Sequence, residues 1–472
     1  MSGRYERPGM LHRIYDHELI VDSFAGGGGA STGIERALGR SPDIAINHDD
    51  AAIAMHMANH PRTHHLLGDV WDADPLLVTR GRPVGLLWGS PDCRHFSRCK
   101  QGKPLSKKVR ALAWSLTRWA ASPSAPRMIT CENVREIQSW GPLLPSGKPD
   151  PAREGQTFRA WVRRFQRSGY HVEWRELNAC DFGAPTSRRR LFVIARRDGA
   201  PIVWPEPTHG PGRIPYRSAA EIIDFSVPTR SIFERDEPLV ENTLARIVRG
   251  VRKYVLKAAR PFVLPVDGDG LIAVPTLIQK GYGERPGQAP RVPGLERPIG
   301  TIVAGGVKHT LAIAFLALHY GGNYKGAGIP LSSPLSTITT IDHHALVTAT
   351  VAHPGSGRGH ADDVRALLRR FPDDEADDDA QGSLFDTGSR DDGLVRIGGK
   401  IYEILDIGAR PLTPRELFRG QGFPEDYIID PVVNGKPLSP SQQVHKCGNS
   451  VPPPVAAALV RANLGAALEM AA

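Results

Sequence analysis

Short apolar segments alternate with helical patterns over the first 200 residues, and this alternation constrains the fold more than any other feature. The apolar segments predict strands at Leu19–Phe24, Ile44–Asn47, Val84–Trp88, Arg127–Cys131 and Leu191–Ala195. The intervening periodicity predicts helices at Thr32–Leu38, Asp50–Asn59, Lys107–Ala121 and Thr157–Ser168. Such alternation is typical of an α/β fold with a doubly wound, mostly parallel sheet that helices cover on both faces. Ligands of these sheets bind at the carboxyl ends of the strands, so the polar residues there are the candidate site.

The first predicted strand leads into a glycine-rich turn, Asp22–Gly29, with a helix beginning near Ser31. Glycines let a backbone approach a ligand closely, and a helix start offers unpaired amides. No Gly-Lys-Ser/Thr ending follows, which argues against a phosphate-binding P-loop, while a plain tight turn stays open. The second strand ends in Asn47–Asp50, where ribose-binding groups usually lie. A third element ends in Gly68–Val70, where the carboxylate of Asp69 can accept from an adenine amino group.

Two neighbouring strands end in side chains capable of covalent and acid–base chemistry. The apolar segment that starts at Leu86 runs into a tight turn that ends in Cys93, a candidate nucleophile at a strand terminus. The next strand delivers Glu132, so a thiol and a carboxyl group are expected to face one ligand. Arg188 and Arg190 alternate at the start of the last strand and should point to the same face.

Together these motifs resemble, in order and spacing, those of cytosine-5 DNA methyltransferases of the bacterial type. The resemblance extends over most of the chain. The matching motifs are Asp22–Gly29, Pro91-Asp92-Cys93, Glu132-Asn133-Val134, Arg188-x-Arg190, Arg410–Glu416, Gln421–Pro424 and Gly448–Val451.

The resemblance implies a Rossmann-like methyltransferase that uses S-adenosyl-L-methionine to methylate a cytosine flipped out of duplex DNA. Cys93 would add to carbon 6 of the base, Glu132 would hold ring nitrogen 3 and the amino group, and Arg190 with Arg188 would contact the carbonyl or the covalent intermediate. Residues 94–108 would close over the DNA as a basic lid. The implied donor-binding residues are Asp22, Phe24, Ala25, Gly26, Gly28, Gly29, His48, Asp49, Asp69, Val70, Asn449 and Ser450.

Three positions depart from the family pattern. Asp92 stands where the family has proline, and a carboxylate there either raises the thiol pKa of Cys93 by like-charge repulsion or points away. His48 occupies the place of a glutamate that binds the ribose, and Thr186 that of a glutamine before the paired arginines. None of these changes removes a group that makes or breaks a bond.

The rest of the chain predicts a second domain. Residues 10–213 and 405–472 would form the catalytic domain, closed by a helix at Pro454–Met470, and 214–404 a smaller, β-rich target-recognition domain. Within it, 295–303 and 331–339 resemble one another about 36 residues apart, which predicts a duplicated β-rich unit. The acidic stretch 371–393 is predicted to be a solvated, mobile loop.

The charge is unevenly distributed. The total is +9, but 371–393 holds nine acids and one base, which leaves +17 on the remainder. A remainder this basic favours binding to the phosphate backbone of a nucleic acid. A GC-rich genome, which enriches arginine, is the alternative explanation.

Composition bounds the remaining expectations. Five cysteines lack metal-ligand spacing and the first 20 residues are polar and charged, which predicts no metal, no secretory signal, no membrane span and a cytoplasmic location. We expect a monomer on duplex DNA; the sequence leaves open the target site and whether a cognate restriction endonuclease accompanies the chain. One alternative is an RNA cytosine-5 methyltransferase, which the long recognition region disfavours. The other is a catalytically silent DNA-binding homologue, whose sequence support is Asp92.

Overall fold

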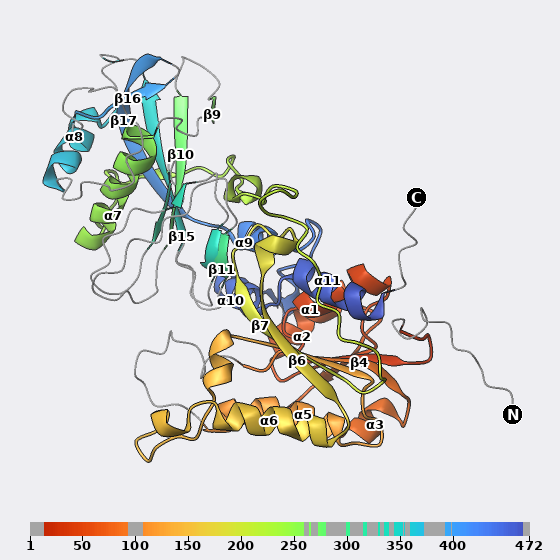
Figure 1. Ribbon diagram of the computed structural model, residues 1–472. Helices are drawn as coiled ribbons and strands as arrows, with labels where there is room; N and C mark the ends of the chain where they lie inside the picture. Colours follow the sequence, from red (N-terminus) through yellow and green to blue (C-terminus); the bar gives the residue numbers. More distant parts are fainter. Residues whose placement is uncertain are drawn as a thin grey trace, which may run out of the picture.

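The computed structural model describes residues 14–92, 107–258, 344–352, 354, 359–371, 392–397 and 399–465. For 264–265, 272–279, 299–302, 315–318, 329–330 and 335–338 it describes the backbone alone. Cys93, the lid residues 94–106 and the acidic residues 372–391 lie outside the described residues, so the predictions about them stay predictions. The chain forms a larger unit built on one sheet and a smaller one at the upper left of Figure 1.

The larger unit is an α/β sheet of seven strands in the order β3-β2-β1-β4-β5-β7-β6. Its neighbouring pairs from β3 to β5 are parallel, whereas β7 is antiparallel to both β5 and β6. This confirms the predicted mostly parallel, doubly wound fold. The strands are β1 (Leu19–Ser23), β2 (Ile44–Asn47), β3 (His64–Leu67), β4 (Val84–Gly89), β5 (Met128–Asn133), β6 (His171–Asn178) and β7 (Arg189–Arg196).

The outermost strands, β3 and β6, were not among the predicted ones. Both lie at the sheet edges, and most of their residues are exposed or half-buried. An edge strand faces solvent on one side and needs no continuous apolar run. The apolar signal that predicted the five central strands is therefore weak in both.

Helices cover both faces of this sheet. Along β1, Leu19 and Val21 pack with Trp161 in one core, while Ile20 packs with Ile34 and Leu459 in another. This alternation places α5 and α6 on one face and α1 and α11 on the other, as Figure 1 shows. The helices of this unit are α1 (Gly29–Leu38), α2 (Asp50–Asn59), α3 (Pro75–Thr79), α4 (Lys107–Ala111), α5 (Ser115–Ala120), α6 (Gln156–Arg167) and α11 (Pro453–Leu464).

Two predicted helices differ from the observed ones. Helix α1 begins at Gly29, ahead of the expected Ser31, because Gly28 adopts φ 90° and caps it. The predicted helix Lys107–Ala121 is divided into α4 and α5 by a 3₁₀ turn at Leu112–Trp114. No proline or glycine marks this division in the sequence.

The smaller unit is a mixed sheet of eight strands with two helices packed on it. Its core joins Val248 and Val251 of α7 to Leu346 of the sheet, and Val364 of α8 to Ile404. The helices are α7 (Glu241–Val251) and α8 (Ala361–Arg370). The strands are β8 (Arg230–Ser231), β9 (Leu264–Pro265), β10 (Ile272–Gln279), β12 (Phe315–Leu318), β13 (Ile329–Pro330), β15 (His344–Ala352), β16 (Leu394–Ile397) and β17 (Lys400–Pro411).

The two similar stretches of the sequence pair with each other. Strands β11 (Ile299–Ile302) and β14 (Leu335–Ile338) form a separate parallel pair, with Ile299 opposite Leu335 and Ile302 opposite Ile338. Equivalent positions of the proposed repeat therefore lie directly opposite one another. This register is what two copies of one β-unit laid side by side would produce.

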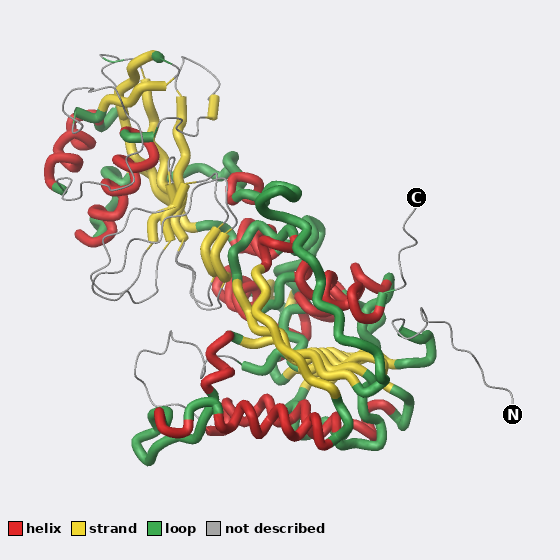
Figure 2. The backbone as a smooth tube through the Cα atoms, in the orientation of Figure 1, coloured by secondary structure: helices red, strands yellow, loops and turns green. Residues whose placement is uncertain are grey.

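The junction between the units is built on β17. This strand runs across the expected domain limit at 404/405 and leads into α9 (Pro414–Gln421) and α10 (Pro440–Asn449), which lie between the units (Figure 2). A short hairpin of β18 (Val432–Val433) and β19 (Lys436–Pro437) separates these helices. At the end of β17, Arg410 donates to the fully buried Glu416 at 2.8 Å. The motif Arg410–Glu416 thus contributes a buried ion pair that holds the junction.

None of the helices in the described part of the chain combines the length and the hydropathy needed to cross a bilayer.

Candidate active site

The carboxyl ends of β1, β4 and β5 lie side by side. Ser23 pairs with Gly89, and Gly89 with Cys131, so the segments that follow these strands leave the sheet at one edge. The predicted juxtaposition of the ends of β4 and β5 is thus confirmed. Residues up to Asp92 and Glu132 are therefore neighbours in space.

The reversed direction of β7 brings the paired arginines to the same edge. Glu132 lies opposite Phe192, and Asn133 opposite Leu191. Since β7 is antiparallel to β5, its first residues, not its last, adjoin the carboxyl end of β5. A parallel β7 would have placed Arg190 at the far edge of the sheet.

Glu132 and the two arginines form a buried charged cluster. Oε1 of Glu132 lies 3.2 Å from Nε of Arg190 and 3.9 Å from Nη2 of Arg188. The exposed fractions are 6% for Glu132, 3% for Arg188 and 8% for Arg190. Among the described residues, Oε1 of Glu132 makes no hydrogen bond, despite its burial. A carboxyl group oriented by two cations, with part of its hydrogen-bonding capacity unused, suits recognition of a polar ring edge.

Hydrogen bonds hold the described residues of the turn before Cys93. Nδ2 of Asn133 donates to the carbonyl of Pro91 at 2.9 Å, and Nε1 of Trp88 donates to Oγ of Ser90 at 3.1 Å. The amide of Ser90 donates to the carbonyl of Ser23 at 3.3 Å. Asn133, part of the Glu-Asn-Val motif, thus ties the end of β5 to the turn that precedes the predicted nucleophile. Asp92 is half-buried, and its influence on Cys93 stays a prediction.

The three cysteines that the structure describes are unsuited to nucleophilic attack. Cys131, Cys180 and Cys447 are all buried. Burial raises the thiol pKa of each, and the charge of Glu132 raises that of Cys131 further. Such thiols stay protonated near neutral pH and behave as small apolar side chains.

The glycine-rich turn between β1 and α1 has a strained backbone. Phe24 adopts φ 66°, Gly26 φ 53° and Gly28 φ 90°. A residue other than glycine rarely adopts positive φ, and such strain gathers at functional sites. A Cβ on Gly26 would meet little besides the carbonyl of Phe24 at 3.8 Å. The turn is therefore open at Gly26 among the described residues.

Packing explains the glycines at the end of this turn. A Cβ on Gly28 would lie 2.3 Å from the hydroxyl of Tyr427, and one on Gly29 would lie 2.2 Å from the carbonyl of Val451. Tyr427 also donates a hydrogen bond to the carbonyl of Gly27 at 2.5 Å. Gly28 and Gly29 thus allow Tyr427 and Val451 of the C-terminal segment to pack against the turn. Their contact with a donor stays a prediction.

Replacing Gly29 by alanine is expected to destabilise the fold by about 2–3 kcal/mol, since the added methyl overlaps backbone that has little room to move. The measurement is chemical denaturation of the variant. Gly68→Ala is the matched control, because a Cβ there meets nothing within 4 Å. Equal stability of the two variants would contradict this account of the turn.

The second strand ends in an ion pair that the sequence did not reveal. Asp49 caps α2 by accepting from the amide of Ala52 at 3.1 Å, and it forms an ion pair with Lys446 of α10. Although burial acts to raise the pKa of Asp49, the hydrogen bond and charge of Lys446 hold it below its usual value. His48 beside it is exposed. Asp49 is therefore ionised and fixed, whereas His48 is accessible to a ligand.

The predicted adenine-binding residues flank the end of β3. Asp69 is exposed and accepts from the amide of Trp71 at 3.0 Å, while Val70 is 6% exposed in the core below the sheet. Asp69 is thus available to a ligand, and Val70 anchors its loop.

Segment 448–451 connects the two ends of the site. Arg188 donates to the carbonyl of Gly448 at 3.1 Å, and Ser450 packs against Gly29. Asn449 is exposed, whereas Ser450 is 5% exposed and its hydroxyl has no hydrogen-bond partner among the described residues. The structure therefore brings this segment beside both the glycine turn and the Glu132 cluster.

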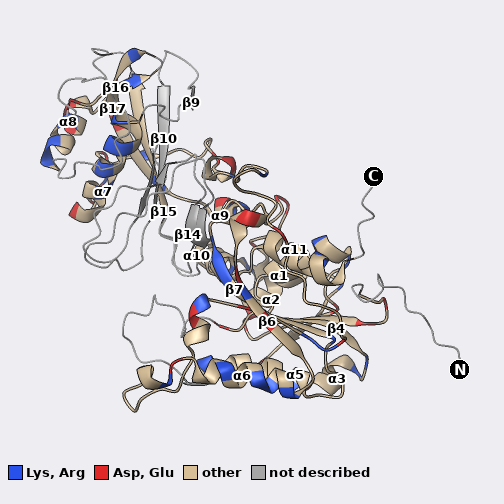
Figure 3. Ribbon diagram, in the orientation of Figure 1, with Lys and Arg blue, Asp and Glu red and all other residues tan. Residues whose placement is uncertain are grey.

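Positive charge is present at the site but is not confined to it. Figure 3 shows basic residues at the start of β7, where the paired arginines lie. Others lie on the outer helix layer: Arg159, Arg163, Arg164 and Arg167 of α6 are all exposed. Part of the predicted positive charge thus lies on the side of α6 that faces away from the sheet.

Several residues that support the site were not predicted from the sequence. Asn133 stood in a recognised motif but had no role assigned. Lys446 and Tyr427 carried no signal because they lie 397 and 400 residues from Asp49 and Gly27, respectively. Among the described residues, no group of three His, Cys, Asp or Glu side chains is arranged to hold a metal ion.

Comparisons with known proteins identify the family. Residues 19–246 and 379–464 match a sequence model described as C-5 cytosine-specific DNA methylase, which is well over half of the chain. The chain therefore belongs to the C-5 cytosine-specific DNA methylase family.

Individual relatives match about two fifths of the chain. Type II methyltransferase M1.HphI of Haemophilus parahaemolyticus is 29% identical over 193 residues, 40% of this chain and 48% of that protein. M.AquIA of Picosynechococcus is 27% identical over 197 residues, 41% of this chain and 77% of that protein. M.NaeI of Lentzea aerocolonigenes is 34% identical over 194 residues, 40% of this chain and 43% of that protein. The chain thus spans about half the length of most of these relatives.

Proposed function

We propose that this chain transfers a methyl group from S-adenosyl-L-methionine to carbon 5 of a cytosine in duplex DNA. The observation that carries the proposal is the buried cluster of Glu132 with Arg188 and Arg190, which adjoins the turn that leads to Cys93. Membership of the cytosine-5 methylase family supports the same chemistry.

Carbon 5 of cytosine is a weak nucleophile until another group adds to carbon 6. In the proposed mechanism the thiolate of Cys93 forms a bond to carbon 6, and electron density moves onto carbon 5 and ring nitrogen 3. With the base bound, the carboxyl group of Glu132 in its protonated form donates a hydrogen bond to nitrogen 3 and stabilises the negative charge that develops there. Carbon 5 accepts the methyl group from the donor, which leaves as S-adenosyl-L-homocysteine. The proton on carbon 5 then passes to water, and the thiolate departs from carbon 6.

The arginines contribute position and charge. Arg190 and Arg188 flank Oε1 of Glu132, so they keep the carboxyl group at the strand end without fully occupying its hydrogen-bonding capacity. We expect one guanidinium to contact the carbonyl of the flipped base as well. The flipping itself follows from the geometry of a duplex, in which carbons 5 and 6 are inaccessible to a side chain.

The predicted donor residues fit a cationic, polar cofactor. Asp22, Glu132 and Ser450 each have one buried polar atom without a hydrogen-bond partner among the described residues. The turn is open at Gly26, and the side chains of His48, Asp69 and Asn449 are exposed. When bound there, S-adenosyl-L-methionine supplies an electrophilic methyl group. Phe24 and the turn would cradle it, Asp69 would bind its adenine, and Asn449 and Ser450 its methionine portion.

Incubation with a tritium-labelled methyl donor tests the proposal. We expect incorporation into duplex DNA of mixed sequence, and none into tRNA. Label on tRNA alone would favour an RNA methyltransferase. No label on any nucleic acid, with the donor bound, would favour a silent DNA-binding homologue. The proposed partner is duplex DNA, bound by one copy of the chain.

A further inference from the structure

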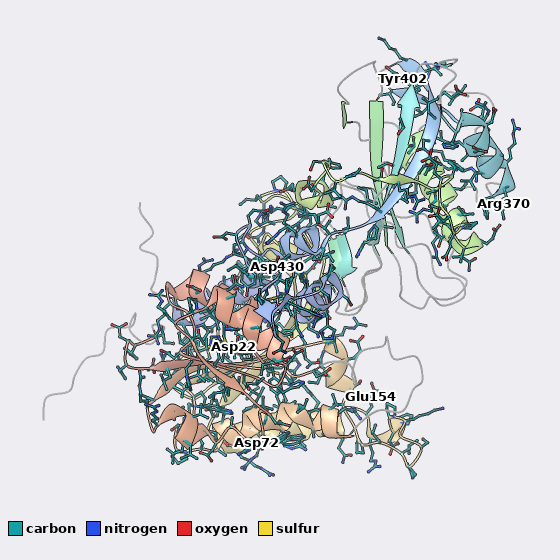
Figure 4. The ribbon with its side chains drawn as sticks, turned by 180° about the vertical axis from the view of Figure 1, so that it is seen from behind. Asp22, Asp72, Glu154, Arg370, Tyr402 and Asp430 are labelled. Atoms are coloured by element: carbon teal, nitrogen blue, oxygen red, sulfur yellow. The ribbon has the colours of Figure 1, made fainter. Side chains whose placement is uncertain are left out.

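A continuous chain of hydrogen bonds leads from the sheet edge to Asp22, and no step of the proposed mechanism uses it. Oγ of Ser31 lies 2.6 Å from Oδ2 of Asp22, and Nε2 of His56 lies 2.8 Å from Oγ of Ser31. Nδ1 of His56 lies 2.8 Å from Nε2 of His65. We call these four residues the Asp22 relay; they come from β1, α1, α2 and β3. Figure 4 labels Asp22 beside helix α1.

The relay is buried at one end and accessible at the other. Asp22, Ser31 and His56 are 0% exposed, whereas His65 on the edge strand β3 is half-buried. Oδ1 of Asp22 has no hydrogen-bond partner among the described residues. An acidic oxygen buried just before the glycine turn and lacking a partner is costly unless a ligand compensates it.

The chemistry of the four groups fixes the direction of their hydrogen bonds. An ionised carboxylate only accepts, so the Ser31 hydroxyl must donate to Asp22 and must itself accept from Nε2–H of His56. Nδ1 of His56 is then unprotonated and accepts from Nε2–H of His65. Both histidines are neutral in this arrangement, and every donor points towards Asp22.

We propose that His56 is a positioning residue of the donor site, which acts through Ser31 to orient and stabilise the ionised carboxylate of Asp22. That carboxylate provides negative charge beneath the turn that receives the cationic methyl donor. The proposal rests on the proposed function, because S-adenosyl-L-methionine carries a sulfonium and an ammonium group.

The surroundings make Asp22 the group that changes charge near neutral pH. Burial raises the pKa of Asp22 to about 7. The hydrogen bonds from Ser31 lower this pKa, but they offset only part of the effect of burial. Burial also holds the pKa of His56 well below its usual value and lowers those of His60 and His65, so these stay neutral.

Two further titratable groups face this region. Burial raises the pKa of Tyr427, which stays neutral, and Glu35 lies 2.9 Å from Nδ1 of His60. Asp22 is thus ionised above pH 7 and protonated below it. A cationic donor should therefore bind more tightly as the pH rises through 7 and more weakly as it falls.

Calorimetric titration of the full chain with S-adenosyl-L-methionine from pH 6 to 8.5 tests this. His56→Phe removes the donor to Ser31 and should shift the midpoint of the affinity profile upward by about one pH unit. If the donor binds only to protein in which Asp22 is ionised, that shift weakens its affinity about fivefold at pH 7. At pH 8.5 most Asp22 is ionised in both proteins, so the affinity hardly changes. His56→Gln can still donate and accept, and should restore the wild-type midpoint. His64→Gln, on the exposed neighbour of His65, is the matched control and should leave the midpoint unchanged.

A second measurement does not depend on the donor. In the unliganded protein labelled with ¹⁵N-histidine, with the signal assigned by His56→Gln, His56 should be the neutral Nε2–H tautomer at pH 8, where Asp22 is ionised. A protonated Nδ1, or identical midpoints for wild type and His56→Phe, would overturn the proposal. Absence of donor binding at every pH would instead contradict the proposed function, together with the inference that rests on it.

Discussion

Replacing Cys93 by serine is expected to lower methyl transfer to DNA by more than about 10³-fold. A serine hydroxyl ionises far less readily than a thiol, so the bond to carbon 6 cannot form at a useful rate. Labelled methyl transfer measures the loss. The adduct itself is measured with duplex DNA containing 5-fluorocytosine, because fluorine at carbon 5 cannot leave as a cation and traps the enzyme on the base.

The matched control for this substitution is Cys99→Ser, a second cysteine six residues further along the chain. We expect wild type and Cys99→Ser to form the trapped complex in the presence of the donor, and Cys93→Ser to form none. Activity retained in Cys93→Ser would remove this thiol from the mechanism.

Replacing Glu132 by glutamine is expected to lower kcat by about 10²- to 10³-fold, since an amide cannot supply a proton to ring nitrogen 3 as negative charge develops there. The substitution keeps the size of a side chain that is 6% exposed. It also leaves Arg188 and Arg190 without their shared carboxylate, which costs stability. Single-turnover methyl transfer and thermal unfolding should therefore be measured together, below the unfolding temperature of the variant.

Glu176→Gln is the control for Glu132→Gln, because Glu176 pairs with Arg189 at 3.9 Å on the neighbouring strands and Arg189 is largely exposed. We expect this change to leave kcat and stability nearly unaltered. A kcat of Glu132→Gln within about threefold of wild type would show that the carboxyl group does not stabilise the transition state.

Hydrophobic patterning predicted the central sheet because its strands are buried on both faces. A short apolar run such as Val84–Trp88 is typical of a central strand of a parallel sheet. Patterning carries no information on strand direction, however. The reversal of β7, on which the contact between Arg190 and Glu132 depends, was therefore not foreseen from the residues alone. The edge strands β3 and β6 were not predicted because they are polar and lack an apolar run.

The site was predicted where its residues lie close to strand ends or in recognised motifs. The contacts that shape it depend on residues distant in the chain: Tyr427 at Gly28, Val451 at Gly29 and Lys446 at Asp49. Glycines in a turn suggest a bound ligand, yet Gly28 and Gly29 are needed because residues of the C-terminal segment pack closely against them. His56 gave no signal either, because a histidine within an apolar helix is usually a satisfied core residue, and its partners lie on three other elements.

The position of the transferred methyl group tests the central claim most directly. Duplex DNA of mixed sequence should be incubated with the chain and a donor that carries a trideuterated methyl group, then digested to nucleosides for mass spectrometry. We predict trideuterated 5-methyl-2′-deoxycytidine as the labelled nucleoside. Label on an exocyclic amino group of cytosine or adenine, or no label in DNA from a chain that binds the donor, would contradict the account.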